Sequence, residues 1–283
     1  METNILKAIT NLVNSPIYKL QAFYKSRNRA NNMGEALEQY IKDIFANTLN
    51  ETDENKRISK ISQTFSYLGN QNNPPDMIIR NGDAIEVKKI ESINSALALN
   101  SSYPKSKLSI NNPMLLASCK KCEDWNEKDI IYTVGVVNDS DLISLCMVYG
   151  NDYAADYAIY EKIRKVIKEG ILTIPDVEFG ETKELGRVNR VDPLGITNLR
   201  IRGMWQIENP RKTFNYVYSS ENAEFNFMAL INVEKYLQFS ESDRIAFEKM
   251  IEENSKINMQ EVKIKNPNNP ASLKNAYLIT YSN

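Results

Sequence analysis

Apolar residues recur three or four positions apart in several long segments of the chain. This spacing occurs in residues 4–14, 34–48 and 153–169, and it places the apolar side chains on one face of a helix. Near the end of the chain, residues 229–238 and 242–253 show the same pattern. We therefore predict a helix in each of these five segments.

Shorter runs rich in β-branched and aromatic residues alternate with these helices and predict strands. Residues 130–137 are so uniformly apolar that neither face suits water, which indicates a central position in a sheet. Further predicted strands comprise residues 64–68, 142–149, 213–218, 260–265 and 276–281. Residues 49–60 are polar and predict a loop. This order of elements predicts an α/β fold, in which helices flank a mixed central β-sheet.

Residues 75–88 combine two short apolar runs with a central Asn81-Gly82 dipeptide, which is typical of a hairpin turn. The position of the turn decides which side chains share a face, because side chains alternate along a strand. A two-residue loop would set Met77 against Glu86 and mix apolar with charged side chains on both faces. A three-residue loop over residues 81–83 places the apolar side chains on one face and the charged side chains on the other, so we predict that register.

In the predicted register, one face of the hairpin is apolar and the other is charged. The apolar face is expected to hold two pairs, Met77 with Val87 and Ile79 with Ile85. The opposite face carries Asp76, Glu86 and Lys88 together. Two carboxylates on one face repel each other and lose hydration, which is costly unless a cation compensates. Mg²⁺ accepts one or two carboxylates and keeps several waters, so we predict a Mg²⁺ site with Lys88 beside it.

The composition narrows the chemistry that is possible. The chain of 283 residues is 42% hydrophobic and 25% charged, as in globular proteins, and we treat it as a single domain without a firm internal boundary. No signal peptide or membrane-spanning run is visible, which predicts a cytoplasmic protein. The absence of histidine removes histidine general bases. Cys119 and Cys122 have zinc-ligand spacing, but no second pair completes such a site.

The net charge of −1 does not indicate a nucleic-acid binder, so local clusters must provide any contacts with DNA. A basic loop over residues 24–32 holds Arg27 and Arg29, and residues 98–108 are rich in hydroxyls and lysines suited to sugar and phosphate oxygens. The candidates in the second stretch are Asn100, Ser101, Ser102 and Lys105. For both stretches, a solvated loop is the alternative interpretation.

Residues 185–205 contain four arginines and one acid. Arg200 and Arg202 alternate with apolar residues, so both should project from one face of a strand. Arginine can bind O6 and N7 of guanine through two parallel hydrogen bonds. The candidates for base contacts are Arg187, Arg190, Arg200 and Arg202. Alternatively, these arginines bind phosphates or structural carboxylates.

The sequence Pro75-Asp76, followed after nine residues by Glu86-Val87-Lys88, resembles the PD-(D/E)xK signature of Mg²⁺-dependent nucleases. Over most of its length the chain resembles the NgoPII family of type II restriction endonucleases, and several further segments carry the likeness. They are residues 9–14, 26–31, 99–105 and 187–205.

The resemblance implies a role for each residue of the motif. Asp76, Glu86 and the carbonyl of Val87 would bind Mg²⁺, and Lys88 would assist the attacking water. Nucleases of this superfamily often supply a further acid from the helix before the hairpin. Glu38 lies at the edge of the apolar stripe of that helix and is therefore the candidate third acid.

The resemblance also implies a homodimer that cuts both strands of a palindrome in double-stranded DNA, with GGCC as the site. The catalytic core would span about residues 30–170 and the DNA-recognition elements about residues 180–215. Two other functions stay open on the residues alone. One is a repair or recombination nuclease that recognises DNA shape. The other is a catalytically inactive DNA-binding protein of the same fold.

Overall fold

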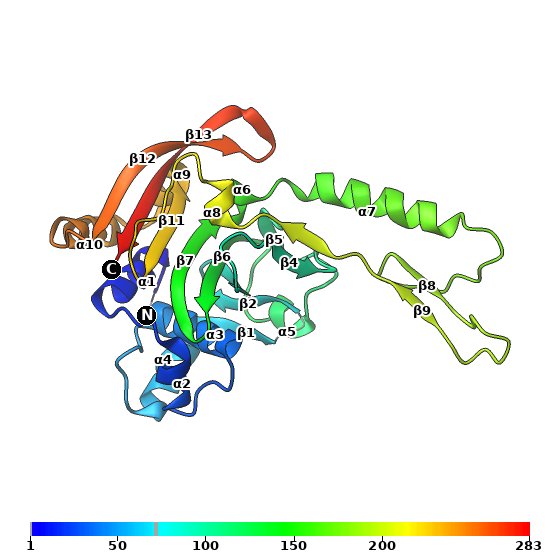
Figure 1. Cartoon of the computed structure of the whole chain (residues 1–283), viewed down its shortest axis with the longest axis horizontal. Helices are drawn as coiled ribbons and strands as arrows, with labels where there is room; N and C mark the ends of the chain where they lie inside the picture. The colour runs from blue at the N-terminus through cyan, green and yellow to red at the C-terminus, as the bar shows by residue number, and fades with distance from the viewer. Residues whose placement is uncertain (1, 71–72) are drawn as a thin grey trace.

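The computed structural model describes residues 2–70 and 73–283, and its centre is a large mixed sheet (Figure 1). Neighbouring strands follow the order β1-β2-β3-β6-β7-β11-β13-β12, and β5 pairs in addition with β6. The pairs β3–β6 and β7–β11 are parallel and the other pairs are antiparallel. The predicted α/β fold with a mixed central sheet is therefore confirmed.

The strands of this sheet and of two smaller sheets all lie after residue 64. They are β1 Phe65–Asn70, β2 Asn73–Ile79, β3 Ala84–Ile90, β4 Leu97–Asn100, β5 Lys107–Ser109, β6 Glu127–Asn138, β7 Asp141–Tyr149, β8 Gly186–Val188, β9 Leu199–Ile201, β10 Trp205–Ile207, β11 Asn226–Asn232, β12 Ile257–Asn266 and β13 Asn269–Ser282. Strand β4 pairs with β10, and β8 pairs with β9.

Ten helices connect and cover the strands within the described part of the chain. They are α1 Ile5–Asn14, α2 Leu20–Lys25, α3 Met33–Ala46, α4 Glu54–Thr64, α5 Ala117–Lys120, α6 Gly150–Tyr153, α7 Tyr157–Leu172, α8 Pro210–Thr213, α9 Val233–Gln238 and α10 Glu241–Glu252. None of these helices has the length and apolarity that a membrane crossing requires.

The two faces of the sheet carry separate apolar cores, because side chains alternate along each strand. In β6, Ile131 packs on one face with residues of α1, α3 and α10, whereas Ile130 and Tyr132 pack on the other with residues of β4 and α5. The core of the first face is the larger and contains the whole apolar stripe of α3. The sheet thus separates the long helices from a thinner layer of short elements.

Most of the predicted helices are present at nearly the expected positions. Helices α1, α3 and α10 match the predictions within two residues, and Ser240 caps α10 by accepting a hydrogen bond from the backbone of Asp243. The helix predicted at residues 229–238 is wrong in its first part. Those residues end β11, which is buried along its whole length, and only the remainder forms α9. A short apolar run does not distinguish a buried strand from a buried helix.

Two other local predictions are wrong. Residues 213–218 are not a strand, because Asn209 and Pro210 start the short helix α8, and two turns follow in which Phe214 and Tyr218 become buried. The loop predicted at residues 49–60 is also incorrect in its second half, which belongs to α4. This helix has few apolar residues, and polar contacts attach it to the body.

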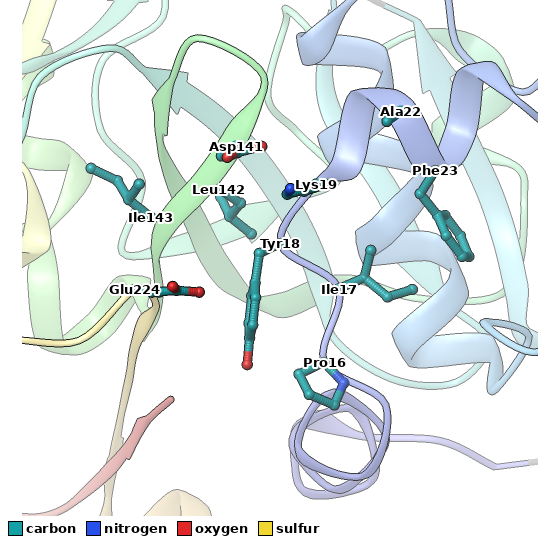
Figure 2. Close-up of a pocket in the computed structure, with 10 residues that line it drawn as sticks. All are labelled: Pro16, Ile17, Tyr18, Lys19, Ala22, Phe23, Asp141, Leu142, Ile143 and Glu224. Carbon is teal, nitrogen blue, oxygen red and sulfur yellow. The ribbon is translucent and has the colours of Figure 1, made fainter.

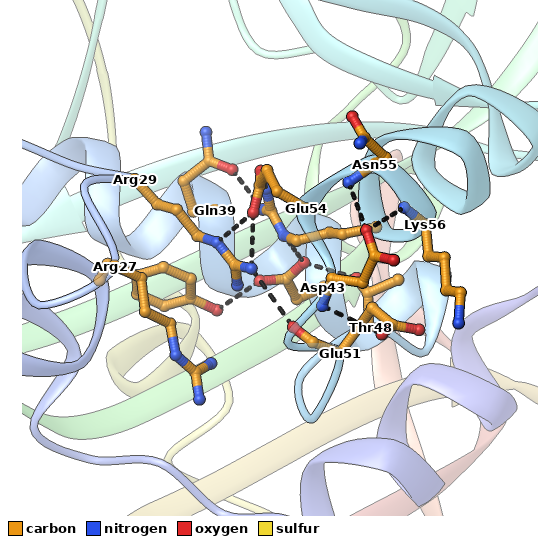
Figure 3. A network of polar contacts seen from close by, with 12 residues as sticks. Arg27, Arg29, Gln39, Asp43, Thr48, Glu51, Glu54, Asn55 and Lys56 are labelled. Carbon is orange, nitrogen blue, oxygen red and sulfur yellow. Dashed lines mark hydrogen bonds and ion pairs between the residues drawn. The ribbon is translucent and has the colours of Figure 1, made fainter.

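A buried network of polar contacts joins α4 to α3 (Figure 3). Asp43 on α3 is completely buried, and its carboxylate accepts hydrogen bonds from Arg57 Nε at 2.8 Å and from Tyr24 Oη at 2.9 Å. Thr48 donates a further hydrogen bond to the same carboxylate. Arg57 also donates to Glu54 at 3.0 Å. A buried carboxylate is stable only when its oxygens are paired in this way.

The β2–β3 hairpin differs in register from the prediction but not in the faces that it forms. Met77 pairs with Ile85 and Ile78 with Ala84, so the predicted pairs Met77 with Val87 and Ile79 with Ile85 are wrong by two residues. The loop consists of residues 80–82, because the backbone N–H of Ile79 donates to the carbonyl of Asp83 at 2.9 Å. A shift of two residues leaves every side chain on its predicted face.

We expect Asp43→Ala to destabilise the protein by roughly 3 kcal/mol, because it leaves the Arg57 guanidinium buried without its main acceptor. Urea unfolding measures the change in free energy. Asp124→Ala is the matched control, since Asp124 is exposed, and it should change the stability by less than about 0.5 kcal/mol. Equal unfolding midpoints for Asp43→Ala and the wild type would contradict this account of the network.

Candidate active site

The β2–β3 hairpin places two carboxylates and an ammonium group side by side. The paired register continues to Asp76 and Glu86 as opposite positions on neighbouring strands. Asp76 Oδ2 accepts a hydrogen bond of 2.6 Å from the backbone N–H of Val87, and Lys88 Nζ lies 2.7 Å from Glu86 Oε1. The structure therefore brings Asp76, Glu86 and Lys88 together, as the hairpin pattern predicts.

Burial and the negative charge of Glu86 raise the pKa of Asp76. Burial raises the pKa of Asp76 to about 7, the negative charge of Glu86 adds to this rise, and Lys88 and the Val87 N–H oppose it. One oxygen of the pair, Glu86 Oε2, is buried without a hydrogen-bond partner among the described residues. An unpaired buried carboxylate oxygen is unfavourable, so a cation at this position would compensate it.

Lys88 keeps its charge in this surrounding. Burial lowers the pKa of the ammonium group, but the charges of Glu86 and Asp76 outweigh burial and raise that pKa above its usual value. A lysine that holds its proton is a hydrogen-bond donor and a positive charge rather than a base. Such a group is able to stabilise negative charge that develops nearby.

Glu38 on α3 lies close enough to act on the same site. Its negative charge raises the pKa of Asp76 and also that of Lys88. Lys42, one helical turn further on, has its Nζ 4.0 Å from Glu38 Oε2. The position at the edge of the helical stripe therefore leaves Glu38 partly exposed next to the hairpin.

Lys105 is a second lysine beside the two acids, although it comes from a distant part of the chain. It is buried, and burial lowers the pKa of its ammonium group to about 8, against the opposing effect of Glu86. Its Nζ donates a hydrogen bond to Ser102 Oγ, and its backbone N–H donates to Tyr132 Oη at 2.7 Å. Of the other candidates nearby, Asn100 is exposed at the end of β4, and Ser101 is partly exposed.

Two residues that support the site were missed in the sequence. Gly69 on β1 packs against the strand that carries Asp76, and an added Cβ would lie 2.4 Å from the carbonyl oxygen of Pro75. Only glycine permits this close approach. Tyr132 fixes the backbone of Lys105 through its hydroxyl. A glycine at a strand end is a recognisable signal, whereas nothing in the sequence links Tyr132 to residue 105.

The donor atoms suit a hard cation. No group of three or more His, Cys, Asp or Glu side chains is arranged as a metal site within residues 2–70 and 73–283. Mg²⁺ needs only one or two carboxylates because it keeps waters, and Asp76 with the unpaired Glu86 Oε2 supplies them. In a strand the N–H and C=O of one residue point to the same neighbour, so the Val87 carbonyl also lies on the side of Asp76.

The predicted DNA contacts Arg27 and Arg29 have partners within the protein (Figure 3). Arg27 Nη1 donates to the carbonyl of Leu49 at 3.1 Å. Arg29 Nη2 lies 2.6 Å from Glu54 Oε2, and its Nε donates to the same carboxylate at 2.8 Å. Both side chains therefore have partners within the protein, so the loop is not simply solvated, and their contact with DNA stays a prediction.

The four arginines of residues 185–205 lie on or next to the small β8–β9 sheet, on an arm that extends from the body (Figure 1). All four are exposed. Arg200 makes two hydrogen bonds to the Glu184 carboxylate, at 2.8 and 3.0 Å, and Arg202 forms an ion pair with it. The two guanidiniums thus share one side, as expected. Arg187 lies opposite Arg200 in the sheet, and Arg190 follows β8.

A pocket of about 720 Å³ lies elsewhere, between the segment before α2, the beginning of β7 and Glu224 (Figure 2). Tyr18 and Phe23 are the aromatic side chains that line it. None of its lining residues belongs to β2 or β3. The pocket is therefore separate from the carboxylate pair.

Comparison with known proteins identifies the class of enzyme. The model of the NgoPII restriction endonuclease family matches residues 3–265, so the chain belongs to this family of restriction endonucleases. Membership makes the chain a site-specific deoxyribonuclease, whose substrate is DNA. The curated protein "Type II restriction enzyme NgoPII" of Neisseria gonorrhoeae is 55% identical over 280 residues, which are 98% of this chain and 99% of that protein. No solved structure matches the chain significantly.

In the metal-free protein, stability should fall as the pH rises from about 4 to about 7. Unfolded Asp76 releases its proton near the ordinary pKa of about 4, whereas folded Asp76 keeps it up to a pKa of about 7. Between these values only the folded state binds the proton, so raising the pH favours unfolding. We expect Asp76→Asn to remove a decline on the order of 3 kcal/mol.

Urea unfolding in the presence of EDTA, at about pH 5 and pH 8, measures this difference. Asp124→Asn is the control, because it removes one exposed carboxylate far from the hairpin in sequence, and it should keep the wild-type decline. A decline of the same size in Asp76→Asn would show that Asp76 does not hold a proton in the folded state.

Proposed function

We propose that the chain is a Mg²⁺-dependent type II restriction endonuclease, which hydrolyses phosphodiester bonds in both strands of a short palindrome. The family resemblance implies the sequence GGCC. The observation that carries the metal-dependent part is the face of the β2–β3 hairpin, where Asp76 and Glu86 are adjacent and one buried carboxylate oxygen has no partner. The restriction activity itself follows from the family.

In this proposal Asp76, Glu86 and the carbonyl of Val87 hold Mg²⁺. The bound ion would supply charge neutralisation at the phosphate and a more acidic water. Lys88 retains its proton and donates a hydrogen bond where negative charge develops. Glu38 adds a third carboxylate at the edge of the site, where it can accept a proton or orient a water.

The DNA contacts are proposed on the same physical grounds. Lys105 and Ser102 form a hydrogen-bonded pair near the acids, which suits the phosphate next to the scissile bond. Arg200 and Arg202 present their donors together toward Glu184. The Glu184 carboxylate accepts hydrogen bonds from the same guanidinium N–H groups of Arg200 that would bind guanine. Arg200 must therefore release Glu184 before it can contact a base.

Two copies of the chain would act on one palindrome, because identical subunits related by a two-fold axis present the same residues to each half-site. We therefore propose a homodimer. Cleavage of DNA inside a bacterial cell also places the enzyme in the cytoplasm. The chain would serve as a single domain, with recognition elements in about residues 180–215.

Asp76→Ala and Lys88→Ala should each lower the rate of DNA cleavage by a factor on the order of 100 or more, since each removes a charge that acts at the reacting phosphate. Binding of DNA, measured in Ca²⁺ without cleavage, should change little. Lys89→Ala is the matched control: Lys89 is exposed on the same strand and pairs with Glu91, so cleavage should stay at the wild-type rate. Wild-type cleavage by either site variant excludes this catalytic role.

Digestion of a mapped, unmethylated plasmid with Mg²⁺ should give discrete fragments whose ends lie in GGCC. Sequencing of the fragment ends tests the site and the position of the cut together. Discrete ends within another sequence would reject GGCC and keep the restriction activity. A continuous smear, or no cleavage in any divalent cation, counts against the proposed function as a whole.

A further inference from the structure

Residues 155–204 form an arm that has no core of its own, and β10, which follows it, pairs with β4 of the body. Of these residues, only Gly186 is buried, and neither of the two buried apolar clusters of the body includes a residue of this range. Figure 1 shows α7 as a rod that leaves the body, with β8 and β9 beyond its far end. A single helix in water is only marginally stable, so the side chains of α7 that no part of the chain covers are available for a further contact.

One face of α7 already contacts other parts of the same chain. The ring of Tyr160 packs 5.7 Å from those of Tyr103 and Trp205. Further along this face, Arg164 Nη2 donates to the carbonyl of Lys183 at 2.6 Å, and Lys168 Nζ donates to the carbonyl of Thr182 at 3.0 Å. These contacts fix the rotation of the helix about its axis.

The opposite face is an exposed apolar seam. It consists of Ile159, Ile163, Val166 and Gly170, with Ile167 at its edge. The first three side chains are 49%, 49% and 59% exposed, and an added Cβ on Gly170 would meet nothing within 4 Å. The intervals of four, three and four residues are those of the a and d positions of a coiled coil, which pack against a second helix.

The order of large and small residues along the seam matches an antiparallel copy of itself. With a two-fold axis midway between Ile163 and Val166, each Ile163 faces Val166 of the second copy, and each Ile159 faces Gly170 of the second copy. The large side chain then fills the space that the glycine leaves. A parallel pair would instead place the two glycines together and leave a gap.

The charges beside the seam favour the same arrangement. Lys162 and Glu169 lie on one edge of it, seven residues apart, and therefore on the same side of the helix. The antiparallel pair brings Lys162 of each copy toward Glu169 of the other, so opposite charges meet twice. Double-stranded DNA offers no such match, because an apolar seam has nothing to bind on a phosphate backbone.

We propose that α7 is the dimer interface of this enzyme, in which the seam of one copy packs antiparallel against the seam of a second copy. The proposal rests on the homodimer of the proposed function and assigns the surface that forms it. The pairing would also fix the two β8–β9 hairpins, with their arginines, at a constant separation for the two half-sites.

Sedimentation of the protein without DNA or metal tests the interface independently of cleavage. The wild type should sediment as two chains at micromolar concentration. Ile163→Glu should weaken association at least about 100-fold, because it buries two unpaired carboxylates. Ile245→Glu on α10 is the matched control, as Ile245 is a helical isoleucine that is 58% exposed, and it should associate like the wild type.

Charge exchange provides a second measurement on folded protein. Lys162→Glu should weaken association, because it places like charges across the interface, and adding Glu169→Lys should restore it. A single-chain wild type, or an unchanged dimer in Ile163→Glu, overturns the proposed interface. The same holds if the double exchange fails to restore association. Site-specific cleavage by a protein with such results leaves the nuclease function intact, whereas a correct dimer without cleavage rejects only that function.

Discussion

Two carboxylates on one sheet face must be held together against their mutual repulsion, and the rest of the catalytic site depends on this constraint. The sheet positions Asp76 and Glu86 on neighbouring strands, while the Val87 N–H and the Lys88 ammonium stabilise their charge. The compensation is incomplete, since Asp76 keeps a raised pKa and one oxygen of Glu86 is unpaired. Both features support the proposed Mg²⁺ site, because a bound cation would compensate the charge of the pair.

The alternation of side chains along β2 and β3 was enough to predict which residues share the charged face. It could not fix the register, because residue pairs that differ by two positions have the same faces. The dipeptide signal placed the turn one residue too late: Asn81, with its positive φ of 55°, is the central loop residue, and Arg80 belongs to the loop. The alternation of side chains therefore predicts which residues share a face. The position of the turn depends on the hydrogen bonds of the folded hairpin.

Predictions were wrong where contacts between distant segments outweigh local pattern. Helix α4 has little apolar periodicity, and its position depends on the ion pair between Arg57 and the buried Asp43. Strand β11 looks locally like a helix, but it lies between β7 and β13, where all its residues are buried. In the same way, Tyr132 holds the backbone of Lys105, whose ammonium group is close enough to Glu86 to feel its charge. No single stretch of sequence contains these pairings, so they required the structure.

The periodicity of residues 153–169 correctly predicted a helix, but it could not show which surface the apolar residues of that helix, α7, contact. Its stripe of apolar residues is as regular as that of α3, yet α3 is buried against the sheet and α7 contributes no buried residue. A stripe of apolar residues indicates a surface that is buried in the functional protein, and the partner that buries it can be a second chain. The seam is complementary to an antiparallel copy of itself. A second copy of the chain would therefore bury the apolar residues of α7. The same contact that completes the arm would then set the distance between two active sites.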